Sequence, residues 1–143
     1  MRLDRELQIG RPRDEVVEVL GREETLLGLF PGETEIVSRN GDSIKTRTHY
    51  TALGREGEAT FVWTFRIDGS VAFEKVCDGR VWKQLSGLVE VDDDGERRSV
   101  VVIEMQGTTK GLVPEFTIKG PMEEQMVAMT EALGRMLDSD PSA

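Results

Sequence analysis

The chain has 143 residues and a mass of 16.0 kDa, which is the size of one domain, and its formal net charge is −9. This charge disfavours nucleic acids and anionic membrane surfaces as partners, because both are bound largely through clustered Lys and Arg. The start "MRLDRELQIG" lacks the apolar core of a signal peptide and no apolar run approaches the roughly 18 residues of a membrane span, so we expect a soluble cytoplasmic protein without stable membrane insertion.

The first third of the chain predicts one strand and two short helices. Residues 2–10 alternate apolar and polar side chains, which indicates a half-buried strand. A short helix follows from Pro12 to Gly21, since Pro suits a first helical position and the apolar residues within this range lie on one face. A second helical stretch, "REETLLGLF", stops at Pro31-Gly32.

From Glu33 to about Gly107 the pattern predicts six strands joined by short turns. The predicted turns each contain a glycine: "RNGD" (39–42), "LGREGE" (53–58), "DGS" (68–70), "DGR" (78–80) and "DDDGE" (92–96). Breaks at this spacing are typical of an antiparallel meander. The acidic stretch "EVDDDGERR" is interpreted as a solvated hairpin tip.

The last part of the chain changes to a helical period. From Pro121 onward, apolar residues recur at three- and four-residue steps: Met122, Met126, Met129, Leu133, Met136 and Leu137. We therefore expect one long amphipathic helix, preceded by an additional helical turn at 114–118. An antiparallel sheet needs one face covered, and this helix is the only large apolar element available for it.

This order of elements resembles the START-like, or SRPBCC, superfamily. The stretches "LFPGETEIVSRNGDSIKTR" (29–47) and "ALGREGEATFVWTFRID" (52–68) are similar to its polyketide cyclase/dehydrase-like branch, which includes a protein associated with carbon monoxide dehydrogenase. The resemblance implies one α+β domain over residues 1–143 with a helix-grip fold, in which a curved seven-stranded antiparallel sheet wraps around a long C-terminal helix. It also implies a cavity between the two that binds an apolar small molecule such as a lipid, a quinone or a polyketide.

Several residues are candidates to line such a cavity. Alternation along the fourth strand puts Ala59, Phe61, Trp63, Phe65 and Ile67 on one face, which must point inward because it is aromatic. The predicted ligand-binding residues are Tyr50, Phe61, Trp63, Phe65, Phe73, Met126, Met129 and Leu133. Ordinary core packing is the alternative for all of the apolar ones.

Catalytic signatures are scarce. The sequence has none of the HExxH, CxxC, P-loop, GxGxxG or GxSxG motifs, and with one His and one Cys it cannot assemble a His/Cys metal cluster, so we expect neither a metal nor a cofactor. Tyr50 and Glu104 are weak candidates for an acid or base. His49 and Tyr50 are adjacent in one strand and so point to opposite faces, which separates the only His from the only Tyr.

Three further residues have an open orientation or role. Arg5 and Lys75 lie in register with apolar faces, and each either points inward toward an acidic group or reaches the rim. Cys77 is interpreted as a buried or rim thiol, not as a nucleophile.

Two main functions follow for this chain. The first is binding or carriage of an apolar small molecule, and the second is a small cyclase- or dehydratase-type enzyme that acts in the same cavity. An accessory protein for an oxidoreductase is a third possibility, which rests on the family resemblance alone. The sequence leaves the ligand open, and it also leaves open whether the protein is a homodimer.

Overall fold

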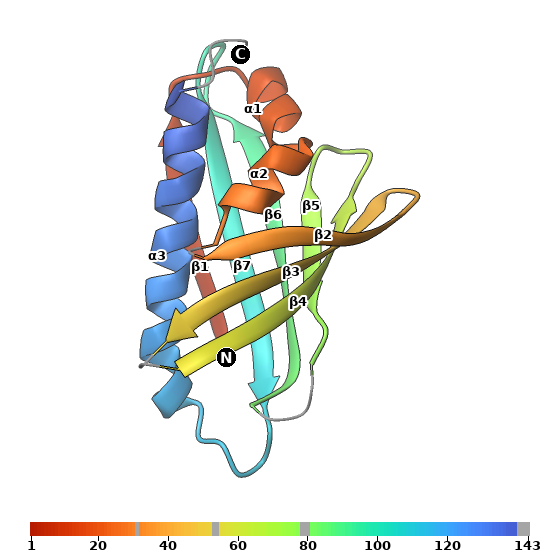
Figure 1. Ribbon diagram of the computed structural model, residues 1–143. Helices are drawn as coiled ribbons and strands as arrows, with labels where there is room; N and C mark the ends of the chain where they lie inside the picture. Colours follow the sequence, from red (N-terminus) through yellow and green to blue (C-terminus); the bar gives the residue numbers. More distant parts are fainter. Residues whose placement is uncertain (31, 53–54, 78–80, 140–143) are drawn as a thin grey trace.

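The computed structural model describes residues 1–30, 32–52, 55–77 and 81–139. Within these residues the order of elements is the predicted one: a strand, two short helices, six strands and a long helix (Figure 1). The elements are β1 (Arg2–Ile9), α1 (Arg13–Leu20), α2 (Glu23–Gly28), β2 (Glu33–Asn40), β3 (Ser43–Ala52), β4 (Arg55–Phe65), β5 (Val71–Lys75), β6 (Trp82–Asp93), β7 (Ser99–Thr109) and α3 (Phe116–Ser139).

The strands form one antiparallel sheet with the order β1-β7-β6-β5-β4-β3-β2. From β2 to β7 each strand pairs with its neighbour in sequence, as expected for a meander, and β1 adds to the edge beside β7. Helices α1 and α2 carry the chain from one edge of the sheet to the other. The fold is therefore the predicted helix-grip arrangement, a seven-stranded sheet with a long C-terminal helix.

Strand register decides which side chains face α3. Thr46 pairs with Phe61 and Trp63 pairs with Phe73, so these four side chains lie on the same face of β3, β4 and β5. All four are buried, with at most 2% of their surface exposed. Figure 1 shows α3 alongside β1, and α3 covers this face, which we call the concave face.

Helix α3 begins earlier than predicted. It starts at Phe116, and Pro121 lies inside it. Its first turn is closed by a hydrogen bond from the Thr117 backbone N–H to the carbonyl of Pro114, at 3.1 Å. Pro121 lacks the N–H that would bond to the preceding turn, and Gly120 before it lacks the Cβ that would crowd the proline ring. The apolar spacing begins only at Met122, so periodicity could not show the first turns.

Two predicted boundaries in β4 are also wrong. The turn predicted at 53–58 is shorter, because β4 begins at Arg55 and includes Gly57. Ile67 does not continue the inward face of β4: the strand ends at Phe65, and Ile67 lies in the turn to β5 with its side chain fully exposed. A hydrogen bond from the Arg66 N–H to the Ser70 carbonyl, at 2.9 Å, closes that turn.

The acidic stretch at 90–98 forms the predicted hairpin tip. Asp94 donates its backbone N–H to the carbonyl of Arg98 at 2.9 Å, and Gly95 has a φ of +102°, a conformation that favours glycine. The predicted turn at 78–80 lies outside the described residues. Among the helices described, none is long and apolar enough to cross a membrane.

Candidate functional site: the concave face and helix α3

Four aromatic rings form the centre of the concave face. Phe30 stacks on Phe61 with ring centroids 5.1 Å apart, and Trp63 lies 5.0 Å from Phe73. Phe61 and Trp63 join the two pairs at 5.9 Å. Pairs at such distances add to the apolar burial of each ring. The predicted residues Phe61, Trp63 and Phe73 are therefore in mutual contact, and Phe30 at the end of α2 completes the group.

Helix α3 closes over these rings with the predicted apolar side chains. Met126 is 1% exposed, and both Met129 and Leu133 are 0% exposed, all within the same core as the aromatic rings. A side chain without accessible surface adjoins no space as large as a water molecule. The interior at Met129 and Leu133 is therefore filled by side chains, and a ligand there would have to displace some of them.

One polar interaction lies inside this apolar region. The Trp63 indole Nε1–H donates a hydrogen bond to Thr46 Oγ1 at 2.9 Å, and both residues are buried. A buried indole N–H needs a partner, because an unsatisfied donor costs free energy. Thr46 therefore fixes the orientation of the Trp63 ring on the concave face.

Two glycines of the concave face lie beneath aromatic rings. A Cβ added at Gly87 would come within 2.2 Å of the Phe73 ring, and one added at Gly107 would come within 2.7 Å of the Trp82 ring. Each ring thus occupies the space that a side chain on the neighbouring strand would need. These glycines let the aromatic side chains lie close to the backbone of β6 and β7.

Tyr50 lies at the rim of the concave face, apart from the aromatic cluster. It shares its face of β3 with Thr46 and Thr48, yet it is 37% exposed. Its ring covers Gly57 on β4, where an added Cβ would be 2.7 Å from Tyr50 Cζ. The Tyr50 hydroxyl can therefore reach a group at the edge of the interior, but Tyr50 does not line the buried cluster.

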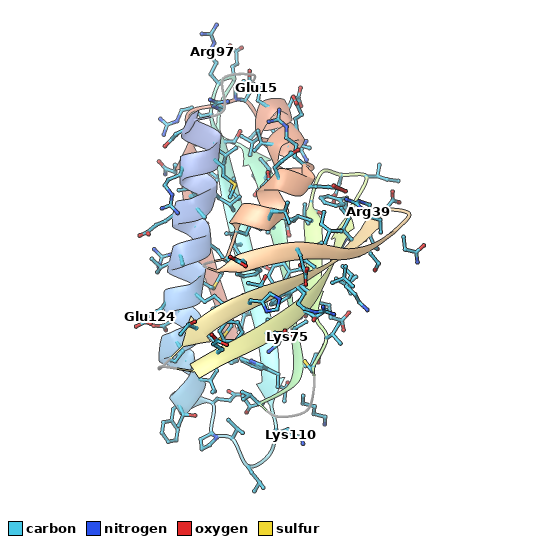
Figure 2. The ribbon with its side chains drawn as sticks, viewed as in Figure 1. Glu15, Arg39, Lys75, Arg97, Lys110 and Glu124 are labelled. Atoms are coloured by element: carbon cyan, nitrogen blue, oxygen red, sulfur yellow. The ribbon has the colours of Figure 1, made fainter. Side chains whose placement is uncertain are left out.

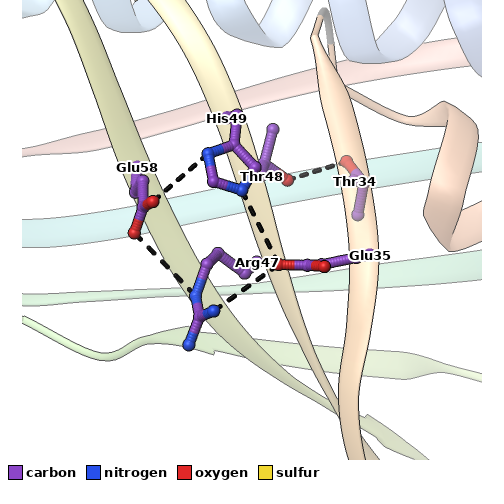
Figure 3. A network of polar contacts seen from close by, with 6 residues as sticks. All are labelled: Thr34, Glu35, Arg47, Thr48, His49 and Glu58. Carbon is purple, nitrogen blue, oxygen red and sulfur yellow. Dashed lines mark hydrogen bonds and ion pairs between the residues drawn. The ribbon is translucent and has the colours of Figure 1, made fainter.

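His49 lies on the opposite face, as the alternation predicts, within a group of surface charges (Figure 3). Its Nδ1 is 3.2 Å from Glu58 on β4, and its Nε2 is 3.6 Å from Glu35 on β2. Arg47 contacts the same two carboxylates, at 3.5 Å and 3.9 Å. Exposed ion pairs of this kind contribute little to stability, and this cluster faces away from α3.

The polar residues with an open orientation now have positions. Glu104 lies on the outer face of β7, where its carboxylate is 3.3 Å from the Arg2 guanidinium, so it cannot act as an acid or base between the sheet and α3. Arg5 is exposed. Lys75 pairs with Phe61 and is half-buried, so it belongs to the concave side near its rim.

The remaining predicted residues are less enclosed than the cluster. Phe65 and Cys77 are half-buried and pack against the edge of the core. The Cys77 thiol lies 3.6 Å from the carbonyl oxygen of Lys75 and is free of any disulfide. Cys77 is therefore the rim thiol that one of the two interpretations of the sequence predicts.

The outer face of the sheet holds a shallow hollow of about 430 Å³. Its lining includes Arg2, Arg66, Glu74, Glu104 and Gln106. A second hollow, of about 740 Å³, lies at the edge near Tyr50 and is bordered by carboxylates. Such polar, open surfaces differ from the mostly apolar pockets that bind small molecules.

Perturbed carboxyl groups lie outside the concave face. A hydrogen bond from the Ser70 hydroxyl, at 2.6 Å, and one from its backbone N–H hold the pKa of Asp68 below its ordinary value. The hydrogen bond and charge of Arg39 likewise lower the pKa of Glu23. In the part of the chain that is described, no group of three or more His, Cys, Asp or Glu side chains could hold a metal ion.

Comparison with solved structures gives the fold its relatives. The Zhui aromatase/cyclase from Streptomyces sp. R1128 is 18% identical, aligns over 96% of this chain and 93% of its own, and has a TM-score of 0.81. A START superfamily protein from Mycobacterium smegmatis is 12% identical over 96% and 97%, with a TM-score of 0.76. The chain has a START-like fold. A STAR-related lipid transfer protein from Xanthomonas axonopodis shares it, with 17% identity over 96% and 86% and a TM-score of 0.70.

Sequence comparison is silent where structure comparison is not: the chain matches no family model and no curated protein. At identities below 20%, the START-like fold is what these relatives share with this chain. The side chains on its concave face are therefore this protein's own.

Sequence reasoning missed four residues that shape the interior of this START-like fold. They are Phe30, Thr46, Trp82 and Met105. The alternation of β3 had already placed Thr46 on the inner face, so its pairing with Trp63 required only the strand register. Phe30 gave no such signal, since it follows a short helix whose packing depends on contacts distant in sequence.

Proposed function

We propose that the protein binds an apolar small molecule between the concave face and α3, of the lipid, quinone or polyketide class. The observation that supports this most is the contiguous lining of aromatic and methionine side chains beneath α3 in a START-like fold. Small-molecule sites are mostly apolar, with a few polar groups that orient the ligand.

The filled interior makes binding a matter of rearrangement. Met126 and Met129 have long unbranched side chains that can adopt other rotamers at low cost, so they can move aside for a ligand. Tyr50 and Lys75, both at the rim, are suited to hold a polar head group of the ligand. The expected occupant is therefore amphipathic, with an apolar body inside and a polar or acidic end at the rim.

Carriage is favoured over catalysis. One relative is named as an aromatase/cyclase and another as a lipid transfer protein, so relatives with this fold suggest either role. General acid–base chemistry needs groups near the bound molecule, and Glu104 lies on the far side of the sheet from it. Tyr50 remains the one candidate for an enzyme, and equal turnover of a model polyketide by wild type and Tyr50→Phe would remove it. A role as accessory to an oxidoreductase rests only on the resemblance to the branch that includes the carbon monoxide dehydrogenase-associated protein.

Fluorescence of Trp63 tests the proposal. The variant Trp82→Phe leaves Trp63 as the only tryptophan, in contact with the proposed site. We expect saturable quenching by at least one of three probes: palmitate, decylubiquinone or the aromatic polyketide emodin. Titrations without a saturable change for all three would count against binding in the interior.

A matched pair of variants locates the site. Met129→Gln puts a polar side chain of similar length at the centre of the α3 face, whereas Met136→Gln changes a half-buried methionine that lies against Gly28 of α2. We expect at least tenfold weaker binding for the first and a small effect for the second. Thermal melts followed by circular dichroism establish that both variants are folded. Equal affinities would place the ligand elsewhere.

A further inference from the structure

One end of the molecule carries large apolar side chains in full contact with solvent. We call it the loop end and define it as Met1, residues 75–77, 81–84 and 107–120. It combines the end of β5, the start of β6, the end of β7 and the start of α3 (Figure 1). Leu112 is 98% exposed and Phe116 is 81% exposed, while Val76 is 49% exposed. Single exposed apolar residues are common, but two large ones that protrude four residues apart make a feature with a cost in water.

The charge of the loop end is opposite to that of the whole protein. The chain has five lysines, and four of them lie here: Lys75, Lys83, Lys110 and Lys119. The only acidic residue in these segments is Glu115, and the Met1 ammonium pairs with it at 3.3 Å. The protein has a net charge of −9, so this basic end reflects an uneven distribution of charge.

The acidic parts of the protein are far enough away to be screened. Helix α3 has 24 residues, so at about 1.5 Å per residue it is roughly 36 Å long, compared with a Debye length of about 8 Å in physiological salt. Figure 2 shows Lys110 at one end of the molecule and Arg97, in the acidic hairpin, at the other. The first acidic pair of α3, Glu123 and Glu124, begins seven residues, or about 10 Å, beyond Phe116. A charged surface in contact with the loop end therefore meets mainly the lysines.

We propose that the loop end docks the protein reversibly on an anionic lipid bilayer. Leu112 and Phe116 enter the boundary between head groups and acyl chains, where apolar side chains leave water. Lys83, Lys110 and Lys119 are exposed beside them and contact anionic head groups with their long side chains. The net charge alone disfavours such a surface, but contact depends on the local charge.

A bilayer fits these side chains better than an acidic protein does. Leu112 and Phe116 protrude from a loop and from the first turn of a helix, and they do not line a groove. A protein partner would need a preformed pocket for each of them, whereas a fluid interface accepts protruding side chains of any shape. Lys75, on the concave side at the same end, would then face the membrane. Docking does not depend on the ligand binding proposed above, and it can be measured without any ligand.

Vesicle flotation tests the proposal with two lipid compositions. Vesicles of phosphatidylcholine alone and with 30% phosphatidylglycerol are mixed with the full chain in low salt and in about 0.15 M salt. We expect binding to the anionic vesicles only, and weaker binding in the higher salt. Equal binding to both compositions, or no binding to either, would overturn the proposal; in the second case an acidic protein would become the partner to seek.

Substitutions at the loop end identify the contacts, with controls at the other end. The double variant Leu112→Ser/Phe116→Ser should reduce partitioning at least tenfold, and Lys110→Gln/Lys119→Gln should reduce it on the order of 25-fold, at about fivefold per lysine. Ile67→Ser, in the turn between β4 and β5, removes another fully exposed apolar side chain and should leave binding unchanged. Lys45→Gln, on β3, is the matched charge control. Loss of binding in a control, or full binding by either double variant, would contradict the assigned surface.

Discussion

The hydrogen bond between Trp63 and Thr46 offers a sharp test of how the interior is held together. Thr46→Val keeps the size and shape of the side chain and removes the acceptor of the Trp63 Nε1–H, which is 2.9 Å away. Thr46 is 0% exposed and Trp63 is 1% exposed, so water cannot replace the lost partner. An unsatisfied buried donor costs about 1–3 kcal/mol. This is a large share of the roughly 5–15 kcal/mol by which a domain is stable.

Urea unfolding followed by far-UV circular dichroism measures the cost, with Thr46→Ser as the control. Serine keeps the hydroxyl acceptor and loses one methyl group, which is worth about 0.8 kcal/mol. We expect Thr46→Val to be the more destabilised of the two, without a change in the denaturant slope. In a Trp63→Phe background the indole N–H is gone, so Thr46→Val should cost less there. A valine variant as stable as wild type, or an equal cost in both backgrounds, would refute this reasoning.

Two other predictions concern the sheet and its turns. Gly87→Ala should destabilise the protein by about 1–3 kcal/mol in urea unfolding, because the new Cβ would lie 2.2 Å from the Phe73 ring and 2.5 Å from a backbone carbonyl oxygen; Gly10→Ala, with nothing within 4 Å, should change little, and similar values for both would contradict the packing. The lowered pKa of Asp68 means that its charged form is favoured in the folded state, so its contribution is present near neutral pH and is lost as the pH falls below about 4. Asp68→Asn should therefore be less stable than wild type at pH 7, and the difference should shrink in acid; a constant difference down to about pH 2.5 would show that the Ser70 hydrogen bonds to the charged form do not matter.

The sequence predicts the fold well because both of its periods are clear. Alternation along β3 assigns His49 and Tyr50 to opposite faces, and the structure agrees, with His49 among outer carboxylates. The methionine spacing from Met122 onward identifies α3 and its buried side. These patterns are local, so they are visible without knowing which strands pair.

Features that depend on distant contacts could not be predicted in the same way. The start of α3 at Phe116 precedes the apolar pattern, and Gly57 has the character of a turn residue although it lies in β4 beneath Tyr50. Glu104 lies within the apolar run "VVVIEM", and only the pairing of β7 with β1 and β6 assigns it to the outer face.

The interior was the least predictable part of the candidate site. Sequence alone could not separate a lined cavity from a packed core, because both need the same apolar side chains. The packing of Phe30 against Phe61 joins the end of α2 to β4, two segments about thirty residues apart, and helps to fill the space that the family resemblance implies is open. Any ligand of this protein must therefore compete with its own side chains.

Methyl NMR of the methionines tests the central proposal most directly. The chain has six methionines: Met1, Met105, Met122, Met126, Met129 and Met136. With ¹³C-methyl-labelled methionine, each gives one signal, and a saturating probe from the Trp63 titration is added. Binding between the concave face and α3 predicts large shifts for Met126 and Met129, and contacts from their methyl protons to the ligand, with Met1 and Met136 nearly unchanged. Saturable binding that leaves Met126 and Met129 unshifted would contradict the proposed site.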